Sequence, residues 1–136
     1  MATAVEVETK FEDPYTIILE VTAVGDETAS EQAVIDVEGK TGPDGLTLAR
    51  TSLREAEWDL SSTFEYAKLY WHDEGNDEVA LTMSGQSSWD GTGFGGNPSP
   101  DEVAQAGDQD VLIDLVNATE SAGTARVTLV FKKKSD

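Results

Sequence analysis

Apolar and polar residues alternate along much of this chain, and a period of two predicts β-strands rather than helices. The clearest example is residues 15–24, where Ile17, Leu19 and Val21 fall on one face. Ile18 falls on the opposite face among threonines and a glutamate. This spacing predicts a strand with one dry and one wet side.

Similar alternation recurs between turn signals along the rest of the chain. The further strands are predicted at residues 32–37, 52–60, 64–72, 79–84, 111–116 and 124–132. We expect Ala33 and Ile35 to share one face, and Val79, Leu81 and Met83 to share another. Residues 46–60 also show a helix-like spacing, and the strand is favoured from Ser52 onward. Roughly seven or eight short strands between turns predict an all-β protein with a single β-sandwich, resembling a jelly roll.

Two regions depart from the strand pattern. Residues 1–14 alternate only weakly before Pro14, so we predict an extended N-terminal arm at 1–14 and the β-sandwich domain at 15–136. Residues 84–100 read SGQSSWDGTGFGGNPSP and hold five of the chain's 12 glycines. Long loops inside compact domains are usually functional or disordered. Because Trp89 and Phe94 lie within this one, we predict an ordered Gly-rich loop that contacts a neighbouring subunit.

Composition narrows the classes of partner. The chain of 136 residues suits one domain, and its formal net charge is -18. Such a charge repels phosphates, so nucleic acid is not an expected partner. The absence of cysteine excludes disulfides and thiol chemistry. The acidic N-terminal segment does not resemble a signal peptide, and no apolar run approaches the length of a membrane span, so no membrane partner is expected.

Several motifs point to chemistry, but each lacks a required part. The glycines of residues 91–96 resemble a phosphate-binding loop, yet no lysine or helix pattern follows them. Asp90, Asp101 and Glu102 offer oxygen ligands for calcium without the spacing of a known loop. His72 is the only histidine, and no nucleophile elbow accompanies it. We therefore expect no enzyme, no catalytic residue, no metal site and no cofactor.

Aromatic and basic residues leave two alternatives open. Tyr66 and Tyr70, with the tryptophans Trp58 and Trp71, could stack on sugar rings, although strand aromatics more often fill cores and interfaces. A carbohydrate- or calcium-binding module therefore remains an alternative. The run Lys132, Lys133 and Lys134 is either a solvated tail or a patch that docks onto an acidic neighbour.

The order of several short motifs resembles a group of small proteins from tailed, often marine, bacteriophages. These motifs are Tyr70-Trp71-His72-Asp73, Leu81-Thr82-Met83-Ser84-Gly85, Trp89-Asp90-Gly91, residues 107–115, and the final segment 127–134 with its lysines. The resemblance covers residues 15–134. It carries over no catalytic residue and implies a β-sandwich with a structural place in the virion.

The function implied by this resemblance is decoration or cement on the outer surface of a phage head. The expected partners are the major capsid protein and further copies of this chain, with a trimer favoured, and the expected location is the capsid surface. A tail-tube, tail-tip or fibre subunit is the alternative within the virion. The residues expected at a subunit or capsid interface are Phe11, Pro14, Trp89, Phe94, Pro98, Lys132, Lys133 and Lys134.

Overall fold

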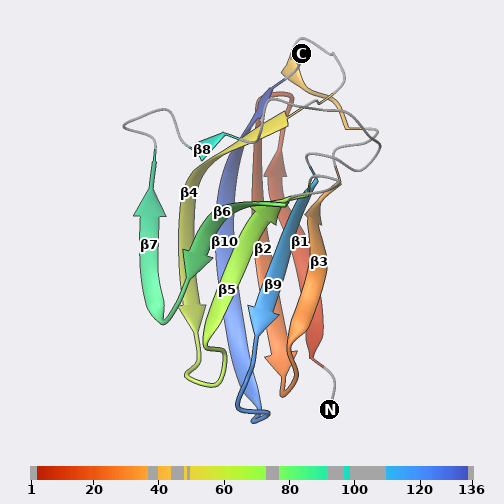
Figure 1. The fold of residues 1–136 in the computed structure, drawn as a ribbon. Helices are drawn as coiled ribbons and strands as arrows, with labels where there is room; N and C mark the ends of the chain where they lie inside the picture. Colours follow the sequence, from red (N-terminus) through yellow and green to blue (C-terminus); the bar gives the residue numbers. More distant parts are fainter. Residues whose placement is uncertain are drawn as a thin grey trace.

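Ten β-strands are present among the residues described by the computed structural model (Figure 1). The structure describes residues 3–36, 40–43, 48, 50–72, 77–91, 97–98 and 110–134. The strands are β1 (Ala4–Glu12), β2 (Thr16–Gly25), β3 (Ala29–Ile35), β4 (Arg50–Leu60), β5 (Tyr66–Trp71), β6 (Glu78–Met83), β7 (Gln86–Asp90), β8 (Asn97–Pro98), β9 (Val111–Val116) and β10 (Gly123–Lys134). Within these ranges, no helix is long and apolar enough to cross a membrane.

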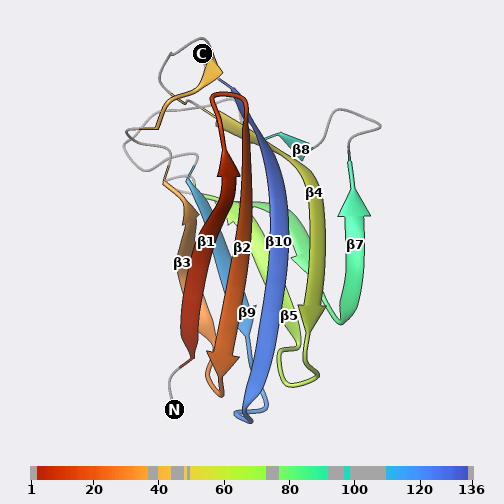
Figure 2. The same ribbon diagram turned by 180° about the vertical axis from the view of Figure 1, so that it is seen from behind.

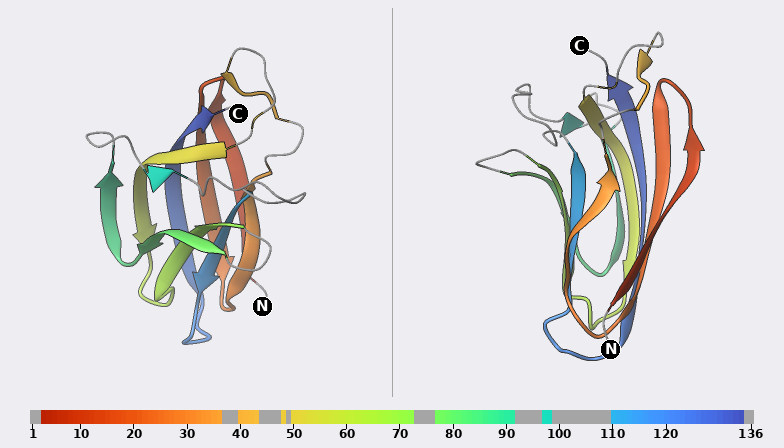
Figure 3. Two further views of the ribbon diagram at one scale, coloured as in Figure 1. Left: turned by 45° about the horizontal axis from the view of Figure 1, so that its top comes forward. Right: turned by 90° about the vertical axis from the view of Figure 1, so that its right-hand side faces the viewer.

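The strands form two antiparallel sheets that lie face to face. The larger sheet has the order β1-β2-β10-β4-β7, and the short β8 pairs with β4 beyond the end of β7 (Figure 2). The smaller sheet has the order β3-β9-β5-β6. The edge-on view shows the two layers (right panel of Figure 3). The expected all-β sandwich is therefore confirmed.

The strand order is that of a jelly roll. When β1 and β8 are set aside, eight strands remain in chain order. In the larger sheet, the neighbours β2, β10, β4 and β7 are the first, eighth, third and sixth of these strands. In the smaller sheet, the neighbours β3, β9, β5 and β6 are the second, seventh, fourth and fifth. Two sheets of four antiparallel strands with these crossovers define the jelly roll. β1 adds a fifth strand beside the first.

The core lies between the sheets and is formed by the inward faces of the strands. Ile17, Leu19 and Val21 of β2 are each 1% exposed, as the alternation of residues 15–24 predicts. Trp71 of β5, in the smaller sheet, and Phe131 of β10, which lies beside Ile17 in the larger sheet, are the largest strand side chains with almost no exposure. Full burial of each such side chain stabilises the fold by about 1.5–3 kcal/mol.

Two β-bulges overturn predictions about which residues share a face. Ala33 is exposed while Ile35 is buried, because the register between β3 and β9 shifts between these residues. Val79 is 50% exposed although Leu81 and Met83 face the core. The register of β5 and β6 shifts between Leu81 and Val79, and one extra residue moves every following side chain to the other face.

The Gly-rich region is only partly a loop. Residues 86–90 form β7, which pairs with β4 from Glu55 to Asp59, and residues 97–98 form β8. The prediction of a loop over the whole of 84–100 is therefore wrong at residues 86–90 and 97–98. Polar serines at exposed edge positions explain why this strand is weakly visible in the sequence. Residues 92–96 and 99–100 lie outside the described residues.

The N-terminal segment expected as an extended arm forms the edge strand of the larger sheet. β1 pairs with β2 from Ala4 opposite Val24 to Glu12 opposite Ile17. Val5 and Val7 face inward and pack against the core, while Glu6 between them and Glu8 after them face outward. Because inward residues alternate with charged ones, β1 covers one edge of the core.

Candidate functional site

An apolar row crosses the outer face of the larger sheet near the turn that joins β1 to β2. Phe11 of β1 lies opposite Ile18 of β2, and Ile18 lies opposite Val130 of β10. Phe11 is 49% exposed, and the other two are partly exposed. A shift between Thr9 and Phe11 makes Lys10 an extra residue in β1 and sets Phe11 on this face.

Other residues expected at an interface gather at the same end. Lys132 lies between Thr16 of β2 and Ser52 of β4, in the register row beside Val130, and Ser52 pairs with Pro98 of β8. Pro14 is exposed in the turn between β1 and β2. The structure therefore brings Phe11, Pro14, Lys132 and the backbone of Pro98 to one end of one sheet.

Lys133 is used inside the protein instead. Its side chain is 2% exposed, and its Nζ lies 2.6 Å from Glu12 Oε2 and 3.1 Å from the carbonyl oxygen of Thr41. Lys40 Nζ lies 3.5 Å from the other oxygen of Glu12. The hydrogen bond from Lys133 lowers the pKa of Glu12, against the opposing effect of burial. Neither a solvated tail nor a docking cation describes Lys133.

The remaining expected interface residues divide between the core and the undescribed part of the chain. Trp89 of β7 lies opposite the buried Ala56 and packs partly against the core. A Cβ atom on Gly91 would overlap the Trp89 ring, so glycine permits this contact. The whole of Phe94 and the side chain of Lys134 lie outside the described residues.

Acidic rows follow the apolar row along the outer face of the larger sheet. One row holds Glu8, Glu20 and Glu57, with Thr128 between the last two. Lys10 Nζ lies 3.2 Å from Glu8 and 3.9 Å from Glu20, so one cation is shared between two strands.

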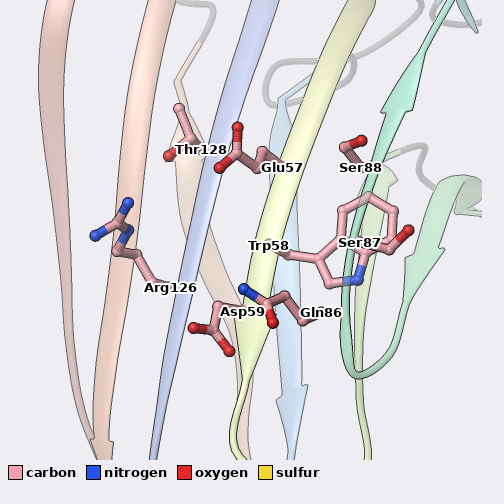
Figure 4. Close-up of a pocket in the computed structure, with 8 residues that line it drawn as sticks. All are labelled: Glu57, Trp58, Asp59, Gln86, Ser87, Ser88, Arg126 and Thr128. Carbon is pink, nitrogen blue, oxygen red and sulfur yellow. The ribbon is translucent and has the colours of Figure 1, made fainter.

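A shallow groove of about 350 Å³ runs over β10, β4 and β7 in this acidic region. Figure 4 shows its charged side chains, Glu57 and Asp59 from β4 and Arg126 from β10, opposite the serines of β7. Arg126 Nε lies 3.8 Å from Glu20 Oε2. The groove is open and polar, which suits contact with a polar surface more than enclosure of a small molecule.

The aromatic residues considered for sugar stacking are mostly in the interior. Trp71 is 1% exposed and donates its Nε1 hydrogen to Thr51 Oγ1 over 3.2 Å. Trp58 is 8% exposed and donates to the carbonyl oxygen of Ser84 over 3.0 Å. Tyr66 of β5 is 38% exposed. These four side chains form no common exposed platform.

A polar cluster lies on the outer face of the smaller sheet. Tyr70 donates its hydroxyl hydrogen to Asp114 Oδ1 over 3.1 Å, and the same oxygen accepts the backbone N–H of Glu31 over 2.7 Å. Lys68 Nζ lies 3.7 Å from Asp114 Oδ2. Burial and the nearby Asp114 raise the pKa of Tyr70, so this hydroxyl stays protonated and Asp114 acts as an acceptor.

Two further motifs have structural roles. Asn117, the acceptor residue of an Asn-Ala-Thr sequon, is 3% exposed and donates its amide hydrogens to the carbonyl oxygens of Ser121 and Gly25 over 2.8 and 3.4 Å. His72 Nδ1 lies 3.0 Å from Asp77 Oδ1, and both side chains are partly exposed. Among the described residues, no group of three histidine or acidic side chains is arranged to hold a metal ion.

Sequence reasoning missed Ile18 and Val130 as surface residues of a site. Alternation placed Ile18 on the wet face of its strand, but it could not align Ile18 with Phe11 and Val130, since that alignment depends on the register between three strands. Comparison of the chain with protein-family models, with curated proteins and with solved structures finds no match.

Proposed function

We propose that this protein is a structural virion protein that decorates the outer surface of a tailed-phage head and stabilises its shell. The apolar row of Phe11, Ile18 and Val130 is the observation that carries this proposal. The jelly roll is one of the architectures used by viral capsid domains, and the motif order in residues 15–134 resembles phage virion proteins. A fold alone does not identify a function, because one fold hosts many functions, so the apolar row is the main support for the proposal.

The apolar row supplies binding energy when a partner covers it. Phe11 is about half exposed, and its burial removes roughly 100 Å² of apolar surface from water, equivalent to about 2.5 kcal/mol. Ile18 and Val130 add smaller areas beside it. Apolar anchors at the centre of a contact dominate binding energy in protein interfaces. The major capsid protein is the proposed partner.

The acidic rows on the same face direct the approach of that partner. Complementary charge speeds association and rejects wrong partners more than it adds affinity. Glu8, Glu20 and Glu57 beside the apolar row favour a cationic patch on the shell. The formal charge of -18 also keeps decorated particles apart.

Co-sedimentation with undecorated heads of the phage that encodes this chain tests the proposal. We expect the wild-type protein to pellet with heads and Ile18→Glu to bind at least about tenfold more weakly, because a carboxylate then replaces a buried apolar anchor. The matched control is Val24→Glu. Val24 is 53% exposed on the same sheet but lies far along β2 from the apolar row.

Three results would contradict the proposal. Failure of the wild-type protein to bind heads removes the decoration function. Equal binding by Ile18→Glu and Val24→Glu removes the apolar row as the docking site. Rings or rods in electron micrographs, without binding to heads, would indicate the tail or fibre alternative.

A further inference from the structure

The outer face of the smaller sheet carries a second apolar row. Ala33 of β3 lies opposite Leu112 of β9, Leu112 opposite Tyr70 of β5, and Tyr70 opposite Val79 of β6. Val79 is 50% exposed and Leu112 is partly exposed, whereas Tyr70 between them is 3% exposed and adds almost no accessible surface. This row crosses all four strands of the sheet.

A shorter apolar row and a neutral polar row lie beside it. Val116 of β9 lies opposite Tyr66 of β5, which is 38% exposed. Between the two apolar rows, Asp114 lies opposite Lys68, and these charges contact each other at 3.7 Å. Glu31 flanks the face on β3. Glu31 and Asp77 also lie close enough to act on Tyr70, so the face carries a small negative charge around this neutral pair.

The larger sheet presents a different electrostatic surface. The paired acidic residues on its outer face are Glu6, Glu8, Glu20, Glu55, Glu57, Asp59 and Asp90. The basic residues there are Lys10, Arg126 and Lys132. Two copies that met through this face would place like charges opposite one another, at a cost of several kcal/mol.

We propose that a second copy of this chain packs on the outer face of the smaller sheet. A chain with a formal charge of -18 repels its copies over most of its surface, so copies can approach where the local negative charge is smallest. Lys68 and Asp114 share one row, and a two-fold rotation can therefore set each base of one copy near the acid of the other. An isologous pair follows.

The size of the face predicts a weak pair. Four strands about 4.8 Å apart and about six residues long, at about 3.3 Å per residue, cover roughly 400 Å². Two copies therefore bury roughly 800 Å², below the usual size of a stable interface. We expect a dissociation constant of about 10–100 µM at low salt. Added salt screens the repulsion between acidic surfaces and should tighten the pair several-fold.

Sedimentation equilibrium of the purified full chain tests this interface at several protein and sodium chloride concentrations. We expect the average mass to rise from one copy to two as the protein concentration increases. In high salt this rise should occur at lower protein concentration. Val79→Glu should weaken the pair by about 50-fold or more, because a carboxylate is then desolvated without a partner. Val24→Glu is the control, since both are exposed strand valines, at 50% and 53%, on different sheets.

A chain that stays monomeric to millimolar concentration would overturn the inference. So would a limiting mass of three copies, or dissociation caused by Val24→Glu and not by Val79→Glu. Thermal melts of both variants establish that each is folded. The pair is measured without heads, so its failure is distinct from failure of the decoration function: a monomer that binds heads refutes only the pair.

Discussion

At the scale of single residues, the buried Lys133 explains why the end of β10 is ordered inside the protein. Its ammonium contacts Glu12 of β1 and the Thr41 carbonyl, and its backbone N–H donates to the Tyr15 carbonyl over 2.7 Å. One side chain therefore joins β10 to the β1–β2 hairpin and to the segment that precedes β4. A buried charge that loses its partner typically costs about 3–5 kcal/mol.

Glu12→Gln should destabilise the protein at neutral pH. The amide keeps an acceptor for Lys133 but loses the charge, so we expect a loss of about 1.5–3 kcal/mol in the free energy of unfolding. Glu8→Gln is the control, because the Glu8–Lys10 pair is exposed and such pairs contribute about 1 kcal/mol or less. Urea unfolding at pH 7 measures both variants.

The same variants should show a distinct pH dependence. The folded-state pKa of Glu12 lies below its ordinary value of 4.5, so its stabilising contribution is complete above that value. It is lost as the pH falls through the folded-state pKa. The gap between wild type and Glu12→Gln should therefore be large at pH 7 and small at pH 3. An equal gap at both values would show that the ion pair does not carry the effect.

At the scale of elements, β1 acts as a structural edge strand. It covers β2, packs Val5 and Val7 on the core and supplies Glu12 to Lys133. Deletion of residues 1–12 should therefore lower the free energy of unfolding by at least about 3 kcal/mol, since Lys133 loses its partner. Chemical denaturation measures the loss. Deletion of residues 1–2 is the control, and equal stability of the two truncated proteins would contradict this role.

Because β1 is part of the sheet, deletion of residues 1–12 is a poor test of head binding. A protein without residues 1–12 loses Phe11 and stability together, so its failure to bind has two explanations. Point changes at Ile18 separate them, because Ile18 lies on the outer face of a strand that keeps both its neighbours.

The sequence predicts the elements better than their alignment. Alternation located β2, β4, β5, β9 and β10 because each has a continuous dry face. It failed at β-bulges, where one extra residue turned Val79 outward, and at β7, whose exposed positions are serines and a glutamine. A bulge breaks the period of two, and β7 lacks the apolar face that would reveal it.

The candidate surfaces were harder to predict for the same reason. Phe11 and Lys132 can be chosen from the sequence as exposed apolar and charged residues, but their proximity depends on the order of strands in the sheet. Lys133 shows the limit most clearly. Nothing in the sequence distinguishes it from the lysines on either side. The partners that bury it, Glu12 and Thr41, lie far away in the chain.

At the scale of the whole molecule, the two outer faces of the sandwich differ in charge and in proposed partner. The larger sheet combines one apolar row with acidic rows, and the smaller sheet combines apolar rows with the Lys68–Asp114 ion pair and less acidic charge. Placed on a shell, such a molecule would dock through one end of the larger sheet and pair through the smaller one. Both contacts use side chains on sheet faces and leave the jelly roll intact.

Electron cryomicroscopy of phage heads saturated with the protein tests whether the sandwich docks on the shell through the larger sheet and pairs through the smaller one. We expect density for the sandwich on the shell, with Phe11, Ile18 and Val130 against the capsid protein and the β3-β9-β5-β6 sheet facing a second copy. Heads without added density, or a sandwich whose β1–β2 end points to solvent, would contradict it.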